Sequence, residues 1–198
     1  MTDRLAPPEF DPADAAAAAA RFAAAAPADV SYALVDSPVG TLVAASTERG
    51  LACLSYADHH GGVDGVLETL AARISPRILE APARLDDVRR ELDEYFEHRR
   101  TTFDLPIDWS LVSPFGRRVL RATATIPFGE VSTYGRIAAQ AGNARAARAT
   151  GNALGANPMP IVVPCHRVLH SGAHGIGRYT GGVHRKEALL RLEGVLLG

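Results

Sequence analysis

A short apolar run enclosed by two prolines is followed directly by a cysteine, a histidine and an arginine. The run is Ile161-Val162-Val163, it lies between Pro160 and Pro164, and Cys165-His166-Arg167 come next. Because prolines border strands rather than lie inside them, the run predicts a short buried strand. A sulfur at the end of such a packed segment is held in place, so Cys165 is the candidate reactive atom.

Composition excludes several classes of protein. The chain has 198 residues, which is enough for one or two domains with a buried core. It contains no apolar run of the ~20 residues that a membrane-spanning helix needs, and its acidic first residues are unlike a signal peptide. Its two cysteines, Cys53 and Cys165, do not make a disulfide framework. We therefore expect a cytoplasmic protein that is not associated with a membrane.

The first half of the chain predicts a small unit of mostly antiparallel strands with two helices. Turn-rich links separate three segments with strand character: residues 32–35, 41–45 and 51–56. Apolar residues follow helical spacing in 63–74 and 85–96, and they alternate as in a strand in 103–107. Cys53 lies in the third strand, where we expect a packing role, because buried free cysteines are common.

Charge divides the chain near residue 108. Up to Asp108 there are 10 Arg against 19 Asp and Glu, a net charge of −9, whereas the remainder has 11 Lys and Arg against three Glu, a net charge of +8. A basic half beside an acidic half suggests a nucleic-acid-facing domain on a support domain; ordinary surface variation is the alternative. We expect three parts: an Ala- and Pro-rich extension at 1–27, an α/β support domain at 28–108, and a nucleic-acid-binding and catalytic domain at 109–198.

Capping residues predict three helices after this boundary. Ser113-Pro114 favours a helix start, with Ser as the N-cap and Pro at the first helical position, and this helix would end near Ile126. Thr133 can cap a helix at 134–141, and Asn143 can cap one at 144–154. Two short helices joined by a Gly-containing turn indicate a helix-turn-helix, although many helical hairpins share this pattern.

The last of these predicted helices is unusually thin. Alanines and Gly151 occupy most of its positions, and Arg145 and Arg148 lie three residues apart, on one predicted face. Such a helix can approach a DNA backbone closely and insert an arginine into the minor groove. The alternative is a small-residue helix packed in a core, with two solvated arginines.

A cysteine needs help to become the reactive thiolate. His166 is the neighbour of Cys165, but adjacent residues of an extended chain point to opposite faces, so a bridging water is favoured over direct contact. Glu193 lies in the last turn of a helix predicted at 184–193, where the helix dipole disfavours a carboxylate. A histidine that becomes cationic would offset that cost, so Glu193, His166, a water and Cys165 form a coherent relay. The alternative is an exposed glutamate and a structural cysteine.

Residues 164–168, Pro-Cys-His-Arg-Val, resemble the active-site signature of the O6-alkylguanine-DNA alkyltransferases, the methylated-DNA–protein-cysteine methyltransferases. The resemblance covers residues 109–198 in order and includes these further motifs: Pro127-Phe128-Gly129-Glu130-Val131, Tyr134, Ala146-Ala147-Arg148-Ala149, Asn157-Pro158, Tyr179-Thr180-Gly181-Gly182 and Leu192-Glu193-Gly194. It implies an α/β (α+β) fold, in which a small ribonuclease-H-like N-terminal domain precedes a mostly helical C-terminal domain with a helix-turn-helix.

The resemblance implies DNA repair by direct reversal. The protein would flip an alkylated guanine out of double-stranded DNA and move the alkyl group, such as methyl, from O6 to Cys165 in a stoichiometric, irreversible step, with O4-alkylthymine as a further substrate. Flipping is also required physically, because a stacked base hides its O6 from a buried sulfur. Cys165 would be the acceptor, His166 the base that acts through water, and Glu193 the residue that orients it.

The resemblance also implies supporting roles. Asn157 would hold the active-site segment and hydrogen-bond near the sulfur, and Tyr134 would face the flipped nucleotide and help to protonate the departing guanine. Arg148 would fill the gap in the base stack. Other DNA-facing positions would be Thr133, Ala147, Arg145 and Gly151. The base pocket would comprise Tyr134, Val168, Tyr179 and Thr180, with the backbone at Val168 and Thr180 reading the base.

Cofactors and partners complete these expectations. The structural zinc of some relatives has no matching ligands here, and His59-His60 fit no zinc spacing, so neither a metal nor another cofactor is expected. The expected partner is double-stranded DNA with O6-alkylguanine, bound by a monomer that needs no protein partner. One departure from the family is a loop between His166 and Tyr179 that is one residue longer.

Three alternatives remain. A non-catalytic protein that binds alkylated DNA would lack the acceptor, whereas Cys165 is present. A helix-turn-helix transcription regulator would carry a polar recognition face and would not need a Cys–His–Glu set. A cysteine hydrolase would turn over repeatedly, whereas an alkyl acceptor stops after one event.

Overall fold

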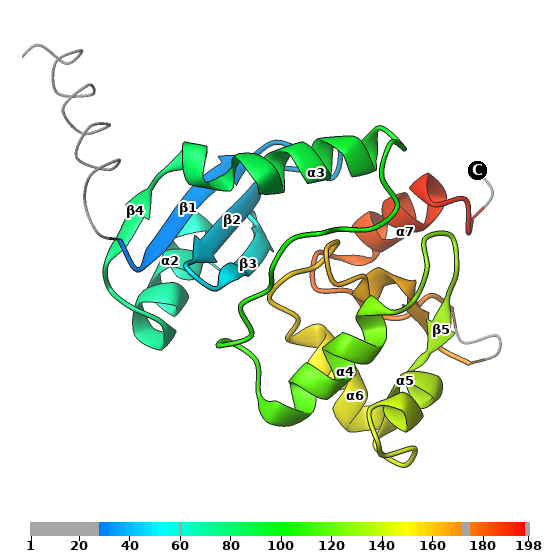
Figure 1. Cartoon of the computed structure of the whole chain (residues 1–198). Helices are drawn as coiled ribbons and strands as arrows, with labels where there is room; N and C mark the ends of the chain where they lie inside the picture. The colour runs from blue at the N-terminus through cyan, green and yellow to red at the C-terminus, as the bar shows by residue number, and fades with distance from the viewer. Residues whose placement is uncertain (1–27, 60, 172–174, 197–198) are drawn as a thin grey trace, which may run out of the picture.

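A four-stranded sheet organises the first half of the chain (Figure 1). The computed structural model describes residues 28–59, 61–171 and 175–196, so the extension predicted at 1–27 lies outside the described residues. The strand order is β3-β2-β1-β4, with β1 at Val30–Val35, β2 at Leu42–Thr47, β3 at Gly50–Tyr56 and β4 at Ile78–Glu80. β1, β2 and β3 pair antiparallel, which confirms the predicted hairpin and third strand, and β4 pairs in parallel with β1.

Side chains alternate between the two faces of this sheet, and a helix covers each face. Leu42 and Ala44 of β2 pack in a cluster with residues of α3 (Asp86–Phe96), whereas Val43 and Ala45 pack with residues of α2 (Gly62–Arg73). The alternation follows from the two-residue period of a strand. Both helices confirm the predicted helical spacing, and a short 3-10 helix, η1 (Pro82–Leu85), precedes α3.

The strand predicted at 103–107 is wrong. Only Ile107 forms a bridge, to Leu51 of β3, and the hydrogen bonds beside it run from Leu51 N to Pro106 O at 2.8 Å and from Asp108 N to Leu51 O at 2.9 Å. Pro106 has no N–H to donate, so a ladder cannot extend along this segment. The segment therefore crosses the edge of the sheet as a link to the second half.

Helices make up most of the second half: α4 (Pro114–Ala124), α5 (Tyr134–Gln140), α6 (Ala147–Gly155) and α7 (Val183–Leu192). The caps predicted for the first two are confirmed. The Ser113 hydroxyl accepts a hydrogen bond from Gly116 N at 3.2 Å, and the Thr133 hydroxyl accepts one from Arg136 N at 3.3 Å. These caps fix where the chain enters each helix.

The third helix of this half starts later than the sequence predicts. The Asn143 side chain accepts a hydrogen bond from Arg145 N at 3.1 Å and so closes a turn, and α6 begins only after Ala146. A short Asx turn of this kind competes with capping. Arg145 therefore precedes α6, and the prediction that it shares a helical face with Arg148 is wrong.

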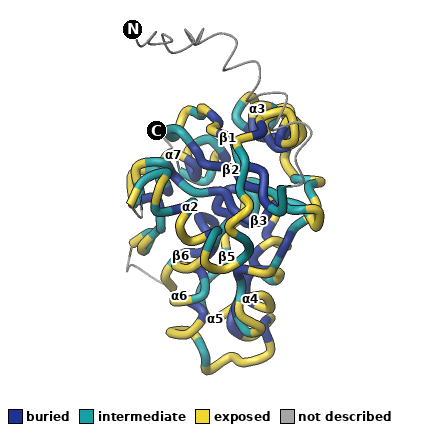
Figure 2. The backbone as a smooth tube through the Cα atoms, turned by 90° about the vertical axis from the view of Figure 1, so that its left-hand side faces the viewer, coloured by how far each residue is buried: buried dark blue, intermediate teal, exposed yellow. Residues whose placement is uncertain are grey.

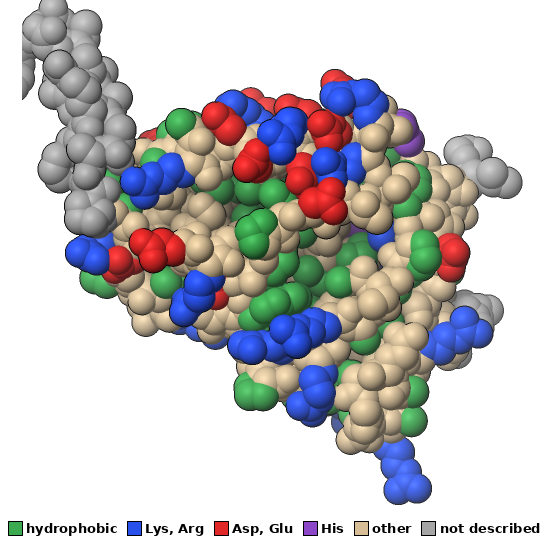
Figure 3. Space-filling view, viewed as in Figure 1, with side chains coloured by type: hydrophobic (Ala, Val, Ile, Leu, Met, Phe, Trp, Pro, Cys, Tyr) green, Lys and Arg blue, Asp and Glu red, His purple; other side chains and the backbone are tan. Residues whose placement is uncertain are grey.

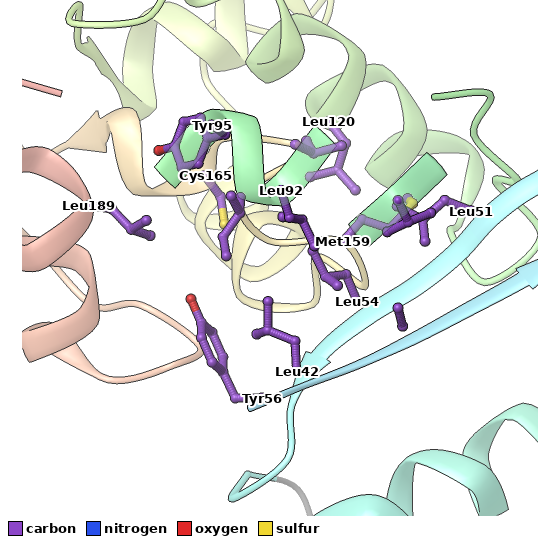
Figure 4. Packing of buried hydrophobic residues seen from close by; sticks show 14 of the residues in the cluster. Leu42, Leu51, Leu54, Tyr56, Leu92, Tyr95, Leu120, Met159, Cys165 and Leu189 are labelled. Atoms are coloured by element: carbon purple, nitrogen blue, oxygen red, sulfur yellow. The ribbon is translucent and has the colours of Figure 1, made fainter. Parts of the chain in front are cut away.

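One hydrophobic core joins the two halves. Figure 4 shows side chains of β2, β3 and α3 packed beside Leu120, Met159, Cys165 and Leu189 of the second half. A backbone hydrogen bond from Leu54 N of β3 to Pro158 O, at 2.7 Å, also links the halves. Figure 2 shows buried backbone through the middle of the molecule, where these elements meet. The first half thus packs directly against the segment that carries the candidate cysteine.

Charge is distributed unevenly over the surface. Figure 3 shows acidic and basic side chains interspersed near α3, whereas the charged side chains around α4 and α5 are mainly basic. Arg117, Arg118 and Arg121 are exposed on α4. Over the part of the chain that the structure describes, no helix is long and apolar enough to cross a membrane, and no cluster of three or more His, Cys, Asp or Glu side chains could hold a metal ion.

Candidate active site and nucleic-acid interface

The apolar run between the two prolines forms a turn, so the strand predicted there is wrong. Ile161 has a φ of 75°, in the left-handed region, and Val163 N donates a hydrogen bond to Met159 O at 2.9 Å. The flanking prolines cannot donate to a strand ladder, whereas the turn buries Ile161 and Val163 in the core. The turn leads into η2 (Cys165–Arg167), a 3-10 helix, and then into β6 (Val168–Leu169), which pairs in parallel with β5 (Ser132–Thr133).

Cys165 is 5% exposed and is held by the Asn157 side chain. Asn157 Nδ2 lies 3.1 Å from Cys165 Sγ and donates to Val163 O at 2.9 Å, while its Oδ1 accepts from Met159 N at 3.1 Å. Burial raises the pKa of the Cys165 thiol to about 11, although the Asn157 hydrogen bond opposes the shift. The sulfur is therefore positioned but protonated at rest, and it needs a base to become a nucleophile.

His166 is fully buried, and its two ring nitrogens have different surroundings. Nε2 lies 2.8 Å from Glu193 Oε1, whereas Nδ1 has no hydrogen-bond partner among the described residues. Burial lowers the pKa of His166, so the ring is neutral near pH 7, although the Glu193 carboxylate opposes the shift. An ionised carboxylate only accepts hydrogen bonds, so the ring proton belongs on Nε2 and Nδ1 keeps a free lone pair. This nitrogen can act as a base.

The Glu193 carboxylate, at the end of α7, accepts hydrogen bonds from three segments of the chain. Tyr95 Oη donates to Oε1 at 2.6 Å, Arg167 donates through Nε and Nη2 at 2.8 and 2.9 Å, and Gly129 N lies 3.4 Å from Oε2. Burial raises the pKa of Glu193, but the hydrogen bonds from His166, Arg167 and Tyr95 outweigh it and lower this pKa to about 2. The carboxylate is therefore ionised and fixed in orientation.

A cavity of about 820 Å³ opens in front of Cys165. It brings together seven of the residues that the sequence predicts for the site: Tyr134, Ala147, Arg148, Gly151, Cys165, Tyr179 and Thr180. His166, Asn157 and Glu193 lie behind the sulfur, and they are buried rather than part of the cavity wall. The sulfur thus faces a space large enough for a nucleobase, with its hydrogen-bonded supports on the other side.

Aromatic rings shape this cavity. The Tyr134 ring lies 5.0 Å from the ring of His170, centroid to centroid, and burial raises the pKa of Tyr134, so its hydroxyl keeps its proton. Tyr179 Oη lies 3.0 Å from Tyr56 Oη, which extends from β3 in the first half. The Thr180 hydroxyl donates to Gly155 O at 2.9 Å and ties this loop to the end of α6. The walls therefore come from α5, α6, residues 170 and 178–180 before α7, and the first half.

Val168 does not line the cavity. It is fully buried, and its carbonyl oxygen accepts a hydrogen bond from Lys186 Nζ at 2.7 Å. Burial lowers the pKa of Lys186 to about 8. A role for the Val168 backbone in reading a base stays a prediction, and it would have to share this carbonyl with Lys186.

The candidate nucleic-acid interface is formed by α5 and α6. Ala147 and Arg148 are exposed at the start of α6, and Arg148 also lines the cavity. Gly151 lies beside the Tyr134 ring, and a Cβ atom added there would meet the ring at an ordinary contact distance of 3.7 Å. Thr133, which caps α5, and Arg145, in the turn before α6, lie outside the cavity wall.

Sequence reasoning missed four residues of the site. Tyr95 belongs to the apolar stripe of α3, so its spacing indicates only a core position. Arg167 lies inside the cysteine motif, but its pairing with Glu193 depends on the fold. Lys186 and His170 lie in a predicted helix and a predicted loop, where charged or polar residues are ordinary.

The second cysteine lies in a different environment. Cys53 borders a separate cavity of about 530 Å³ between β3, α2 and the segment 155–160, and this cavity does not include Cys165. Burial raises the pKa of Cys53 to about 12. Its thiol is therefore unreactive, in agreement with the packing role predicted for it.

Comparison with protein families gives two matches that together cover almost all the described residues. Residues 30–109 match the family model described as "6-O-methylguanine DNA methyltransferase, ribonuclease-like domain", and residues 114–195 match "6-O-methylguanine DNA methyltransferase, DNA binding domain". The expected α+β fold, with a small ribonuclease-like part before a mostly helical one, is confirmed.

Individual proteins agree with the family matches. The chain is 42% identical over 165 residues to a methylated-DNA–protein-cysteine methyltransferase of Mycolicibacterium paratuberculosis, which covers 83% of this chain and 92% of that protein. It is 35% identical over 181 residues to a protein of the same name from Rattus norvegicus, covering 85% and 84%. A crystal structure of Mycobacterium tuberculosis OGT in complex with DNA superposes with a TM-score of 0.71 at 36% identity, covering 83% of this chain and 93% of that one.

Proposed function

Because this chain belongs to the methylated-DNA–protein-cysteine methyltransferase family, we propose that it repairs double-stranded DNA by moving the alkyl group of O6-alkylguanine to its own Cys165 in a single, irreversible event. The observation that carries this proposal is a buried, protonated Cys165 sulfur at the cavity, followed in the same 3-10 helix by a neutral His166 whose other ring nitrogen is held by Glu193. We propose the same chemistry, as a secondary activity, for O4-alkylthymine.

The lesion must leave the base stack before transfer. Cys165 is 5% exposed at the wall of a cavity, so a base that remains paired in the duplex cannot bring its O6 to the sulfur. Arg148, exposed at the start of α6 beside the cavity, is suited to fill the space that the flipped nucleotide leaves. The extrahelical base would then lie between Tyr134 and Tyr179, and the backbone at Val168 and Thr180 would contact its polar edge.

Proton transfer and alkyl transfer balance in this scheme. His166 Nδ1 takes the thiol proton of Cys165 through a water, and the resulting imidazolium is stabilised by the Glu193 carboxylate at Nε2. The thiolate attacks the alkyl carbon, the bond from this carbon to O6 breaks, and its electron pair stays with the guanine. Tyr134 donates a proton to the departing guanine. The proton that His166 took from Cys165 is then released, and Tyr134 regains a proton through solvent. A thioether on Cys165 and an unmodified guanine remain, so the protein reacts once.

The domain arrangement that we propose follows the charge division. Residues 28–108 form the support domain, residues 109–198 carry the DNA interface and the reaction, and residues 1–27 form an extension. We also propose that the protein acts as a cytoplasmic monomer without a metal or another cofactor.

Intact-mass measurement tests the proposed function. Mixing the protein with duplex DNA that contains O6-methylguanine should add one methyl group, ~14 Da, to each protein molecule and no more, because the acceptor is consumed. Tight binding of the lesion without a mass change would favour the non-catalytic lesion-binding alternative. Repeated product release without a mass change would favour a hydrolase.

Arg148→Ala should weaken repair without changing the chemistry at the sulfur. A side chain that replaces a flipped base in the stack contributes about 1–3 kcal/mol, so we expect the apparent second-order rate of transfer from duplex DNA to fall roughly 10- to 100-fold. The free base O6-methylguanine needs no flipping, and its slow reaction should be unchanged. Arg90→Ala, which removes an exposed arginine of α3, is the matched control for the loss of one positive charge. Equal losses with both substrates would refute this role.

A further inference from the structure

We propose that Tyr95, from the first half of the chain, is a positioning residue for alkyl transfer, because its hydroxyl fixes the Glu193 oxygen that also holds His166. This inference rests on the proposed function of the Cys165–His166–Glu193 relay. It gives the first half a part in the reaction beyond support of the fold.

Tyr95 is held rigidly against the carboxylate. It is 0% exposed on α3, and its hydroxyl lies 2.6 Å from Glu193 Oε1, across 98 residues of sequence. The rings of Phe96, Phe103 and Phe128 lie 5.2, 5.4 and 5.9 Å from its ring, centroid to centroid. Because its neighbour Phe96 on α3 and two rings from other segments, Phe103 and Phe128, fix its position, the hydroxyl can direct the carboxylate rather than follow it.

The direction of the hydrogen bond is determined by the two groups. Burial and the neighbouring carboxylate raise the pKa of Tyr95, so the phenol keeps its proton. The Glu193 carboxylate is ionised and can only accept. Tyr95 therefore donates to Oε1, which is the same oxygen that lies 2.8 Å from His166 Nε2.

Sharing one oxygen couples Tyr95 to the basicity of His166. Each hydrogen bond donated to Oε1 lowers the basicity of the carboxylate that faces the imidazole. Loss of the Tyr95 hydroxyl therefore leaves a more basic carboxylate facing Nε2. A more basic carboxylate stabilises the imidazolium and raises the pKa of His166. Since the ring must be neutral to take the thiol proton, the acidic limb of the transfer rate should move to higher pH.

Other titratable or charged groups also face this pair. Arg167 of η2 donates to both Glu193 oxygens, Lys186 of α7 and Arg167 both lower the pKa of His166, and the Tyr179 ring lies 6.4 Å from the His166 ring. Cys165 precedes His166 on the same 3-10 helix. Tyr95→Phe removes no charged group, although the Tyr95 hydroxyl also interacts with Arg167, so a shift of the pH profile would report the loss of this hydroxyl from the cluster around Glu193.

The experiment compares single-turnover transfer from O6-methylguanine DNA between pH 4 and pH 9 for the unmodified protein, Tyr95→Phe and Tyr32→Phe. We expect Tyr95→Phe to move the acidic limb up by roughly one pH unit and to lower the plateau rate up to about tenfold, because the carboxylate loses a constraint. Tyr32→Phe is the matched control, since it removes a hydroxyl that lies 3.5 Å from Glu80 Oε2 in the same half of the chain. Its profile should match that of the unmodified protein.

A second measurement does not depend on transfer. Titration of His166 by ¹⁵N NMR, without DNA, should show the same upward shift of its pKa in Tyr95→Phe. Incorporation of 3,5-difluorotyrosine at position 95 keeps the donor and strengthens it, so it should move the pKa of His166 down. An unchanged pKa of His166 in both proteins would overturn the inference. If Tyr95→Phe folds poorly, the fluorinated protein, which keeps the donor, still provides the test. Absence of transfer by the unmodified protein would instead refute the proposed function.

Discussion

Cys165→Ser is expected to abolish alkyl transfer while the protein still binds DNA that contains the lesion. A serine hydroxyl is far less acidic and less nucleophilic than a thiol, and the neutral His166 that can deprotonate Cys165 cannot ionise an alcohol to a useful extent. We expect the transfer rate to fall by on the order of 10⁴-fold or more, which leaves no detectable gain of mass. Lesion binding should persist, because the exchange keeps the size and the polarity of the side chain.

The other cysteine provides the control for this experiment. Cys53→Ser removes a buried thiol that borders a different cavity and whose pKa is raised to about 12. It should leave stoichiometric transfer intact, with any loss confined to stability. Transfer of a methyl group to Cys165→Ser, or its loss in Cys53→Ser at a temperature where that variant is folded, would contradict the assignment of Cys165 as the acceptor.

Local sequence signals predicted much of the fold. The hairpin of β1 and β2 and the caps Ser113 and Thr133 depend on neighbours within a few residues, and the structure confirms them. The turn at Pro160–Pro164 could not be predicted in this way. An apolar run bordered by prolines has the same pattern whether it is a strand or a turn, and the left-handed Ile161 is stabilised only when the core receives its side chain.

The candidate site likewise contains residues that the sequence predicts and residues that it does not. A carboxylate at the end of a helix breaks a local rule, and the sequence alone shows that Glu193 occupies such a position. The structure places it 2.8 Å from His166, and the catalytic role of this pair stays a prediction. Tyr95 breaks no local rule, because a tyrosine on an apolar stripe is ordinary, and its hydroxyl meets Glu193 only through long-range packing. A hydrogen bond between residues so far apart in the sequence can be identified only once the packing of the two halves is known.

Glu193→Gln is expected to destabilise the protein by about 3–5 kcal/mol, because it breaks a buried ion pair and leaves the Arg167 cation without its counter-charge. The glutamine amide would also bring two N–H donors to a position where Tyr95, His166 and Arg167 already donate. Urea unfolding at pH 7 measures the loss. Glu187→Gln is the matched control on the same helix, since its exposed pair with Arg191 should contribute no more than about 1 kcal/mol.

The pH dependence of this loss separates the charge of Glu193 from its shape. The pKa of Glu193 is lowered to about 2 in the folded protein from its ordinary value of 4.5, so the ionised carboxylate stabilises the fold fully above pH 4.5. That contribution is lost progressively as the pH falls from 4.5 towards 2, because the unfolded chain then binds a proton at this carboxylate while the folded protein stays ionised until about pH 2. The difference in unfolding free energy between the unmodified protein and Glu193→Gln should therefore shrink over this interval. A difference that stays constant down to pH 2 would mean that packing, rather than the charge facing Arg167 and His166, makes Glu193 important.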